Sequence, residues 1–198
     1  PRFYDATDGE VLVDGVNVKD YRFDTLYDKL GYVTQKAVLF SGTVRDNVLL
    51  GESAAPADEE TLEQAIRLSE AKEFVDKLPE GTEHAIAQLG RNVSGGQKQR
   101  LSIARALARK PEILIFDDSF SALDYRTDAK LREGLARELP DTTKIIVAQR
   151  ISTIRHADRI IVLDRGQAVG IGTHEELMQN CSVYREIATS QLSVAELA

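Results

Sequence analysis

The sequence predicts an α/β fold with a mainly parallel β-sheet. Three short apolar runs, at residues 113–116, 144–148 and 159–163, have the length and composition of buried strands. Stretches with helical spacing of apolar residues alternate with them, which indicates βαβ units. Hydrophobic residues make up 42 % of the 198 residues and charged residues 29 %, as in globular domains.

Composition excludes several classes of protein. No apolar run approaches the ~18 residues that predict a membrane-spanning helix. The formal net charge of −7 argues against a nucleic-acid partner, because phosphate backbones attract basic surfaces. The single cysteine, Cys181, excludes an internal disulfide framework and a cysteine-rich metal site.

The N-terminal elements follow from turn and cap signals. Residues 10–18 alternate β-formers around an Asp-Gly pair at 14–15, which predicts a β-hairpin. A short helix is expected over 24–30, ended by Gly31, and a strand over 32–34.

The middle of the chain has helical patterns. Thr43 is a candidate N-cap, and a charged helical stretch runs over 58–78 until the Pro-Glu-Gly turn at 79–81. A further helix is expected from the Ser-Gly-Gly-Gln segment at 94–97 to about Arg109, with a buried apolar stripe.

The C-terminal part repeats the strand–helix alternation. A helix is expected over 126–139, buried strands over 144–148 and 159–163, and a hairpin with 167–171. Residues 173–176 read Thr-His-Glu-Glu, a capping box for a last helix, and residues 193–198 are expected to fray.

Polar residues at strand and helix ends carry the candidate chemistry. Residues 94–96 place a hydroxyl and glycine N–H groups at a helix start, which suits an anion. Asp117 ends an apolar strand, where a carboxylate can hold Mg²⁺ beside phosphates. Gln35 and Gln149 end neighbouring strands and are expected at the same edge. Each feature alone is also typical of an ordinary turn or a solvated side chain.

Taken in order, these segments resemble the nucleotide-binding domain of ATP-binding-cassette (ABC) transporters over essentially the whole chain. Residues 93–97 are similar to the signature motif, 113–117 to the Walker B strand and 121–124 to the D-loop. Gln35 is similar to the Q-loop glutamine, and Gln149 occupies the switch-histidine position. Such a resemblance implies a P-loop NTPase-like cassette with an antiparallel hairpin region and a helical subdomain.

The resemblance also implies ligands, partners and site residues. We expect a single cassette over 1–198, with a helical insertion near 36–110 and the Walker B, D-loop and switch regions in 111–198. The stretch 39–47 is similar to exporter-type members, which implies a transmembrane domain fused upstream, a second cassette as partner and the cytoplasmic face of the cell membrane. ATP and Mg²⁺ are the implied cofactors. The implied site residues are catalytic Asp118 and Gln149; nucleotide-binding Gln35, Ser94, Gly95, Gly96, Gln97 and Asp124; and Asp117 with Gln35 for Mg²⁺.

Three departures from the family pattern lead to further expectations. No Gly-x-x-x-x-Gly-Lys-Ser/Thr segment occurs in the 198 residues, so the N-terminal P-loop unit is expected to be missing and the chain alone inactive. Asp118 stands where the family has a glutamate base, and Gln149 stands where it has histidine. Aspartate is one methylene shorter, and glutamine cannot become cationic.

These departures indicate the degenerate-site half of a heterodimeric exporter with an intact signature. Two alternatives stay open: a homodimeric exporter whose non-standard residues work, and a non-enzymatic interaction fragment without a P-loop.

Overall fold

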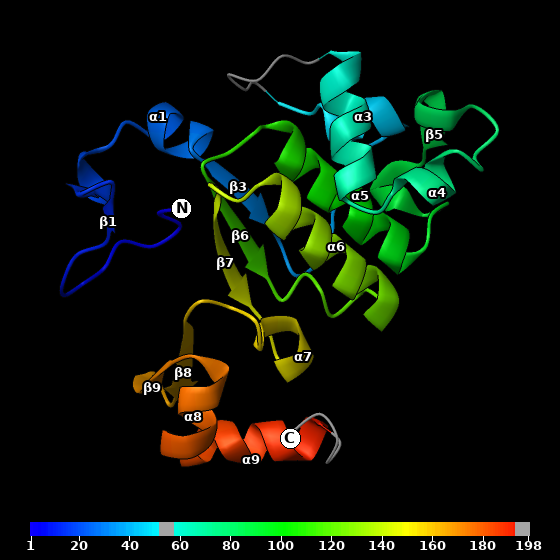
Figure 1. The fold of residues 1–198 in the computed structure, drawn as a ribbon. Coiled ribbons are helices and arrows are strands. Elements are labelled where there is room, and N and C mark those ends of the chain that lie inside the picture. The colour runs from blue at the N-terminus through cyan, green and yellow to red at the C-terminus, as the bar shows by residue number, and fades with distance from the viewer. Residues whose placement is uncertain (52–57, 193–198) are drawn as a thin grey trace. The chain divides into compact units, whose positions relative to one another are not determined.

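The computed structural model describes residues 1–51 and 58–192 and divides into two compact units, residues 1–145 and 146–198 (Figure 1). The expected fraying of 193–198 lies outside the described residues. Within the described ranges, no helix is both long and apolar enough to cross a membrane.

The first unit begins with the predicted hairpin. Strands β1 (Leu12–Val13) and β2 (Val16–Asn17) pair antiparallel, which confirms the prediction. Asp14 and Gly15 between them have φ values of 51° and 76°, the left-handed conformation that a two-residue hairpin turn needs. The 3₁₀ turn η1 (Val18–Asp20) follows.

A parallel strand pair forms the centre of the first unit. After α1 (Phe23–Asp28), strand β3 (Leu30–Val33) pairs in parallel with β6 (Ile113–Asp117). The sheet order is β3–β6–β7, with β7 covering Thr143–Val147. The predicted parallel sheet is therefore confirmed for β3 and β6.

Gly31 does not end the helix as predicted; it lies inside β3. A Cβ atom at this position would stand 2.8 Å from both Leu114 Cδ2 and Pro111 Cγ. Glycine is therefore required by close packing against β6, a constraint from residues about 80 positions away that looks locally like a helix stop.

Short capped elements build the helical part. Thr43 caps α2 (Val44–Val48) in a reciprocal capping box with Asp46, as its position predicts. Strand β4 (Gly42–Thr43) pairs with β5 (Ala85–Ile86).

The predicted helical stretch over 58–78 is broken. It consists of α3 (Glu59–Leu68) and α4 (Lys72–Val75), because Glu70 between them adopts a left-handed φ of 58°. The 3₁₀ turns η2 (Gly81–Glu83) and η3 (Gln88–Gly90) lead to the long helix α5 (Gly95–Ala108).

The core of the first unit lies among α5, β6 and α6 (Tyr125–Glu138). Its fully buried side chains include Leu101, Ile103, Leu114, Phe116 and Leu131.

The apolar runs predict buried strands, and this prediction is wrong for one face of each strand. In β6, Leu114 and Phe116 are fully buried, but the alternate residues are only partly covered. In β7, Ile145 and Val147 are 49 % and 53 % exposed. Among the described residues these strands are covered on one face only. An apolar run therefore does not by itself predict that both faces of a strand are buried.

The second unit is a hairpin packed with helices. It contains α7 (Ile151–Ile154), the antiparallel pair β8 (Ile160–Asp164) and β9 (Gln167–Gly172), α8 (His174–Asn180) and α9 (Ser182–Gln191). The hairpin and the Thr173–Glu176 capping box confirm the predictions. Its core joins Ile160, Leu177 and Tyr184, whereas Ile161 and Leu163 are exposed, so β8 too is buried on one face only.

Candidate active site

The carboxyl ends of β3 and β6 bring three predicted residues together. Val33 of β3 is in register with Phe116 of β6, so the residues that follow these strands emerge at the same edge. There the Gln35 side-chain amide donates a 3.0 Å hydrogen bond from Nε2 to Oδ2 of Asp118. Asp117, the last residue of β6, lies directly beside this pair in the chain.

A tyrosine that the sequence analysis missed holds the Asp117 carboxylate. The Tyr32 hydroxyl donates a 2.8 Å hydrogen bond to Asp117 Oδ2. Burial and this hydrogen bond raise the pKa of Tyr32, so the hydroxyl stays protonated and remains a donor. The sequence feature that could have indicated this contact is the position of Tyr32 near the end of a predicted strand.

The turn after β6 is fastened to β3. Ser119 is fully buried, and its hydroxyl donates a 2.9 Å hydrogen bond to the carbonyl of Val33. Asp118 has a φ of 46°, a left-handed conformation that aspartate tolerates better than most residues. The Ser121 hydroxyl donates a 2.7 Å hydrogen bond to the Asp118 carbonyl. The turn therefore fixes the direction in which the Asp118 side chain leaves the sheet.

Helix α5 supports the Gln35 side of the site. Gln99 is 1 % exposed, and its side-chain amide donates a 3.2 Å hydrogen bond to the carbonyl of Thr34, the neighbour of Gln35. The feature of the sequence that could have indicated this role is a polar residue within the stretch that forms α5. The sequence analysis did not include Gln99 among the site residues.

The N-terminus of α5 forms a second group of predicted residues. Ser94 and Gln97 cap the helix reciprocally, with Ser94 N donating to Gln97 Oε1 at 2.8 Å and Gln97 N donating to Ser94 Oγ at 3.3 Å. The N–H groups of Gly95 and Gly96 precede the first intrahelical bond, from Lys98 N to the Ser94 carbonyl. Such groups and the helix dipole favour an anion.

The segment after β6 lies beside this helix start. A Cβ at Gly96 would stand 3.4 Å from the Ala122 carbonyl oxygen, about van der Waals contact, so the two segments are close neighbours. Asp124 caps α6 by accepting hydrogen bonds from Thr127 N at 2.9 Å and Thr127 Oγ1 at 2.7 Å. These bonds lower the pKa of Asp124. Asp124 therefore has a structural role in this chain, beside the nucleotide contact that the resemblance implies.

Gln149 lies in the second unit. Its backbone carbonyl accepts a 2.9 Å hydrogen bond from the Gln191 side chain. Its predicted position at the same edge as Gln35 stays a prediction.

The donor chemistry at the β6 edge fits Mg²⁺. Carboxylate and carboxamide oxygens are hard ligands of the kind that Mg²⁺ prefers. Within residues 1–51 and 58–192, no three or more His, Cys, Asp or Glu side chains gather into a metal-binding group. Mg²⁺ is commonly held by one or two carboxylates and keeps several waters or phosphate oxygens in its shell, which Asp117 would suit.

A parallel strand pair, one strand of which ends in two carboxylates, with the turn after it beside a glycine-rich helix start, is typical of nucleotide-binding α/β domains. A sequence profile described as ABC transporter matches residues 2–121. The chain belongs to the ABC transporter family.

Relatives and solved structures agree with this assignment. The chain is 47 % identical over 191 residues to an uncharacterized ABC transporter ATP-binding protein of Mycobacterium tuberculosis, covering 96 % of this chain and 32 % of that protein. It is 44 % identical over 191 residues to a Staphylococcus aureus protein provisionally named a multidrug export ATP-binding/permease protein, covering 96 % and 33 %. A bacterial Atm1-family ABC exporter with ATP bound superimposes with a TM-score of 0.89 and 34 % identity, covering 96 % and 33 %. The chain thus spans about a third of the length of these proteins.

Proposed function

We propose that this chain is the ATP-binding and ATP-hydrolysing part of an ABC exporter at the cytoplasmic face of the cell membrane. The observation that carries the proposal is the placement of Asp117, Asp118 and Gln35 at one edge of the parallel β3–β6 pair. The export function named for the Staphylococcus aureus relative and for the similar solved structure supports it. The transmembrane domain and a second cassette would be the partners.

The residues at this edge would divide the work on ATP. Asp117 would hold Mg²⁺, which neutralises charge on the β- and γ-phosphates, and Tyr32 fixes the orientation of the Asp117 carboxylate. Asp118 would be the acceptor for the proton of the attacking water, with Gln35 holding one of its oxygens.

Substitution of Asp117 tests this assignment. In the whole protein with its partners, we expect Asp117→Asn to abolish most Mg²⁺-dependent hydrolysis at this site while the fold is retained. Asp141→Asn, an exposed loop aspartate, is the control for loss of one carboxylate. Equal hydrolysis in Asp117→Asn and Asp141→Asn would refute the role of Asp117.

We further propose that this site is the slow one of a heterodimer. Asp118 offers a shorter arm than the family's glutamate, and Gln149 cannot carry a proton or a positive charge. The helix start at residues 94–97 would instead complete the partner's site, where its N–H groups would face the γ-phosphate.

The double substitution Asp118→Glu with Gln149→His tests the slow site. In the full-length heterodimer it should raise ATP turnover, and unchanged turnover would contradict a catalytic defect. Robust cooperative hydrolysis by the parent protein purified alone would favour the homodimer alternative.

The absence of a Gly-x-x-x-x-Gly-Lys-Ser/Thr segment supports one more proposal, that these 198 residues alone have no ATPase activity and bind Mg-ATP weakly at most. Calorimetry on a sample whose intact mass is 21.9 kDa tests it. Binding at that mass would mean that the phosphate site is built differently, whereas no binding leaves a signature-side or interaction role for the isolated chain.

A further inference from the structure

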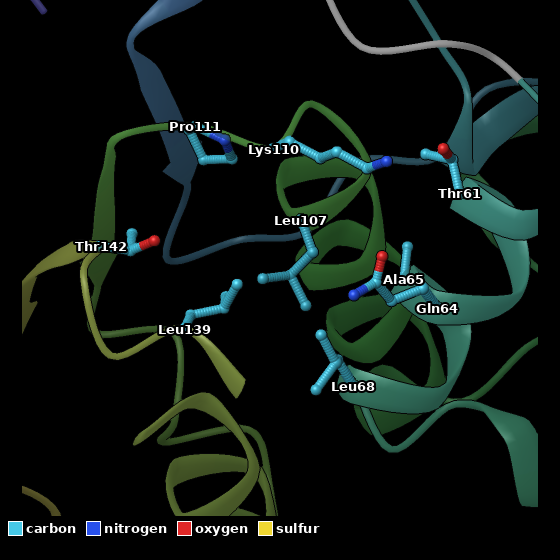
Figure 2. A pocket seen from close by; sticks show the side chains of 9 residues that line it. All are labelled: Thr61, Gln64, Ala65, Leu68, Leu107, Lys110, Pro111, Leu139 and Thr142. Carbon is cyan, nitrogen blue, oxygen red and sulfur yellow. The ribbon is translucent and has the colours of Figure 1, made fainter. Parts of the chain in front are cut away.

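The first unit contains a cavity of about 190 Å³ between α3 and the C-terminal end of α5 (Figure 2). None of the candidate active-site residues lines it. Pro111 before β6 and the α6–β7 connection at Leu139 and Thr142 line its remaining side. The cavity is therefore not part of the candidate active site, and any ligand of it would bind apart from the nucleotide.

Most of the cavity wall is apolar. Ala65 and Leu68 of α3 face Leu107 of α5, and these three side chains are 2 %, 5 % and 6 % exposed. Apolar protein cavities of ~150 Å³ can take up a benzene-sized molecule. The space is thus sufficient for one ring with a small substituent.

One end of the cavity is polar. Thr61 is 2 % exposed, and its buried hydroxyl oxygen has no hydrogen-bond partner within residues 1–51 and 58–192. Buried polar atoms are nearly always partnered, so this hydroxyl indicates a place for a polar group of a ligand. In Figure 2 the Lys110 side chain extends along the rim toward Thr61, and the Gln64 amide faces the interior. All three side chains can donate hydrogen bonds.

The polar end of the cavity also has a negative charge nearby, that of Asp58. Asp58 caps α3 by accepting a 2.9 Å hydrogen bond from Thr61 N. The hydrogen bond from Thr61 N is the largest cause that lowers the pKa of Asp58, and the charge of Lys110 lowers it to a smaller extent, so Asp58 is an anion near Lys110. An acidic ligand would share the Lys110 charge with Asp58, which does not itself line the cavity.

We propose that this cavity is a binding site for a small apolar carboxylic acid, with its ring or short chain among Ala65, Leu68 and Leu107 and its carboxylate at Thr61 and Lys110. Three converging donors, one of them cationic, favour an anionic acceptor over a neutral or basic group. The site is independent of the proposed ATPase function, and its test does not use nucleotide.

Benzoate is the probe, and benzamide is its neutral counterpart of the same shape. Calorimetry and ligand-observed NMR on the protein should show saturable benzoate binding that is tighter than benzamide binding and weakens with added salt. Lys110→Gln should weaken benzoate by roughly fivefold and leave benzamide unchanged, since partly exposed ion pairs contribute about that much. Lys77→Gln, an exposed lysine on the 76–79 segment, is the matched control.

Two variants that fill the cavity test its location. Ala65→Leu and Gln64→Phe should each abolish binding of both probes; Gln64 is only partly buried, so that variant keeps the test available if Ala65→Leu does not fold. Asp58→Asn retains a good helix cap and should tighten benzoate but not benzamide. Benzoate binding that is absent, or that survives both Lys110→Gln and Gln64→Phe, would overturn the proposal.

Discussion

The hydroxyl of Tyr32 donates a 2.8 Å hydrogen bond to Oδ2 of Asp117, joining the end of β3 to the end of β6. The bond occupies one carboxylate oxygen with a neutral donor, so it orients the side chain without removing its charge. Tyr32 also packs edge-on against Phe3, with ring centroids 5.4 Å apart, which holds the phenol ring in place.

We predict that Tyr32→Phe weakens Mg²⁺-dependent activity severalfold while changing the free energy of unfolding by only ~1 kcal/mol, the usual contribution of one hydrogen bond. The measurement is the Mg²⁺ dependence of ATP hydrolysis in the whole protein, together with urea unfolding. Tyr21→Phe is the matched control, because the Tyr21 hydroxyl donates a 3.1 Å hydrogen bond to the Val13 carbonyl in the hairpin. An equal effect of both substitutions on the Mg²⁺ dependence would contradict a positioning role for Tyr32.

The backbone at Asp118 supports a second prediction. Its φ of 46° is tolerated by aspartate and asparagine but costs other side chains ~1 kcal/mol or more. Asp118→Asn should therefore leave the free energy of unfolding nearly unchanged, whereas Asp118→Ala should lower it by about 2 kcal/mol through strain and the lost Gln35 hydrogen bond. Denaturant titrations decide between these outcomes, and equal stability of the two variants would mean that the turn relaxes.

The left-handed backbone at residue 118 also affects the stability of the Asp118→Glu variant. Asp118→Glu keeps the carboxylate but places a longer side chain on a left-handed backbone. The Asp118→Glu, Gln149→His variant should thus be less stable by ~1 kcal/mol even if its turnover rises.

Local signals in the sequence were sufficient for the caps and the turn. The capping box predicted at Thr173 forms, Thr43 is the N-cap that its position predicts, the helix predicted from Ser94 begins there, and the Asp14–Gly15 hairpin forms. These features depend on residues within four positions of one another. They are therefore readable without knowledge of the fold.

Long-range contacts were not readable in this way. The Tyr32–Asp117 bond joins residues 85 positions apart, and Gly31 was misread because the reason for it is packing against Leu114 and Pro111. The apolar run of β7 gave no information on which of its faces is covered. Edge placement of Gln35 and Asp118 was predictable because parallel strands end together, but the hydrogen bond between them was not.

Arg105 supports a prediction about the segment that follows Gln35. Its guanidinium donates to the Asn47 carbonyl at 2.7 Å, to Asn47 Oδ1 at 3.0 Å and to the Val38 carbonyl at 3.0 Å. Burial lowers the pKa of Arg105, which reflects how far the charge is withdrawn from water. We predict that Arg105→Ala lowers the free energy of unfolding by about 3 kcal/mol, because several acceptors lose their donor at once.

Two further variants separate this effect from loss of charge alone. Arg105→Lys should recover part of the stability, since an ammonium group can reach only some of these acceptors. Arg91→Ala removes an exposed arginine and should change stability by less than ~0.5 kcal/mol. A small effect of Arg105→Ala in urea unfolding would show that solvent replaces the guanidinium.

The ion pair between α3 and α6 gives a pH-dependent prediction. Arg67 donates to both carboxylate oxygens of Glu138, at 2.7 and 2.5 Å, and Arg137 donates a further 3.0 Å bond. Arg67 first, and then Arg137, lower the pKa of Glu138 from 4.5 to about 2. Because the folded-state pKa is the lower one, the unfolded chain binds the proton more readily. The contribution of Glu138 to stability is therefore fully present above its unfolded pKa and is lost as the pH falls toward about 2.

We accordingly predict that the stability difference between the wild-type chain and Glu138→Gln is constant above about pH 5 and shrinks steadily below it. Urea unfolding at a series of pH values measures this difference, and added salt should reduce it because the pair is partly exposed. Glu63→Gln, an exposed carboxylate of α3, is the control. Arg67→Ala should remove most of the pH dependence that Glu138→Gln removes. If the pH dependence persists in Arg67→Ala, then Arg137 rather than Arg67 holds the carboxylate in its charged form.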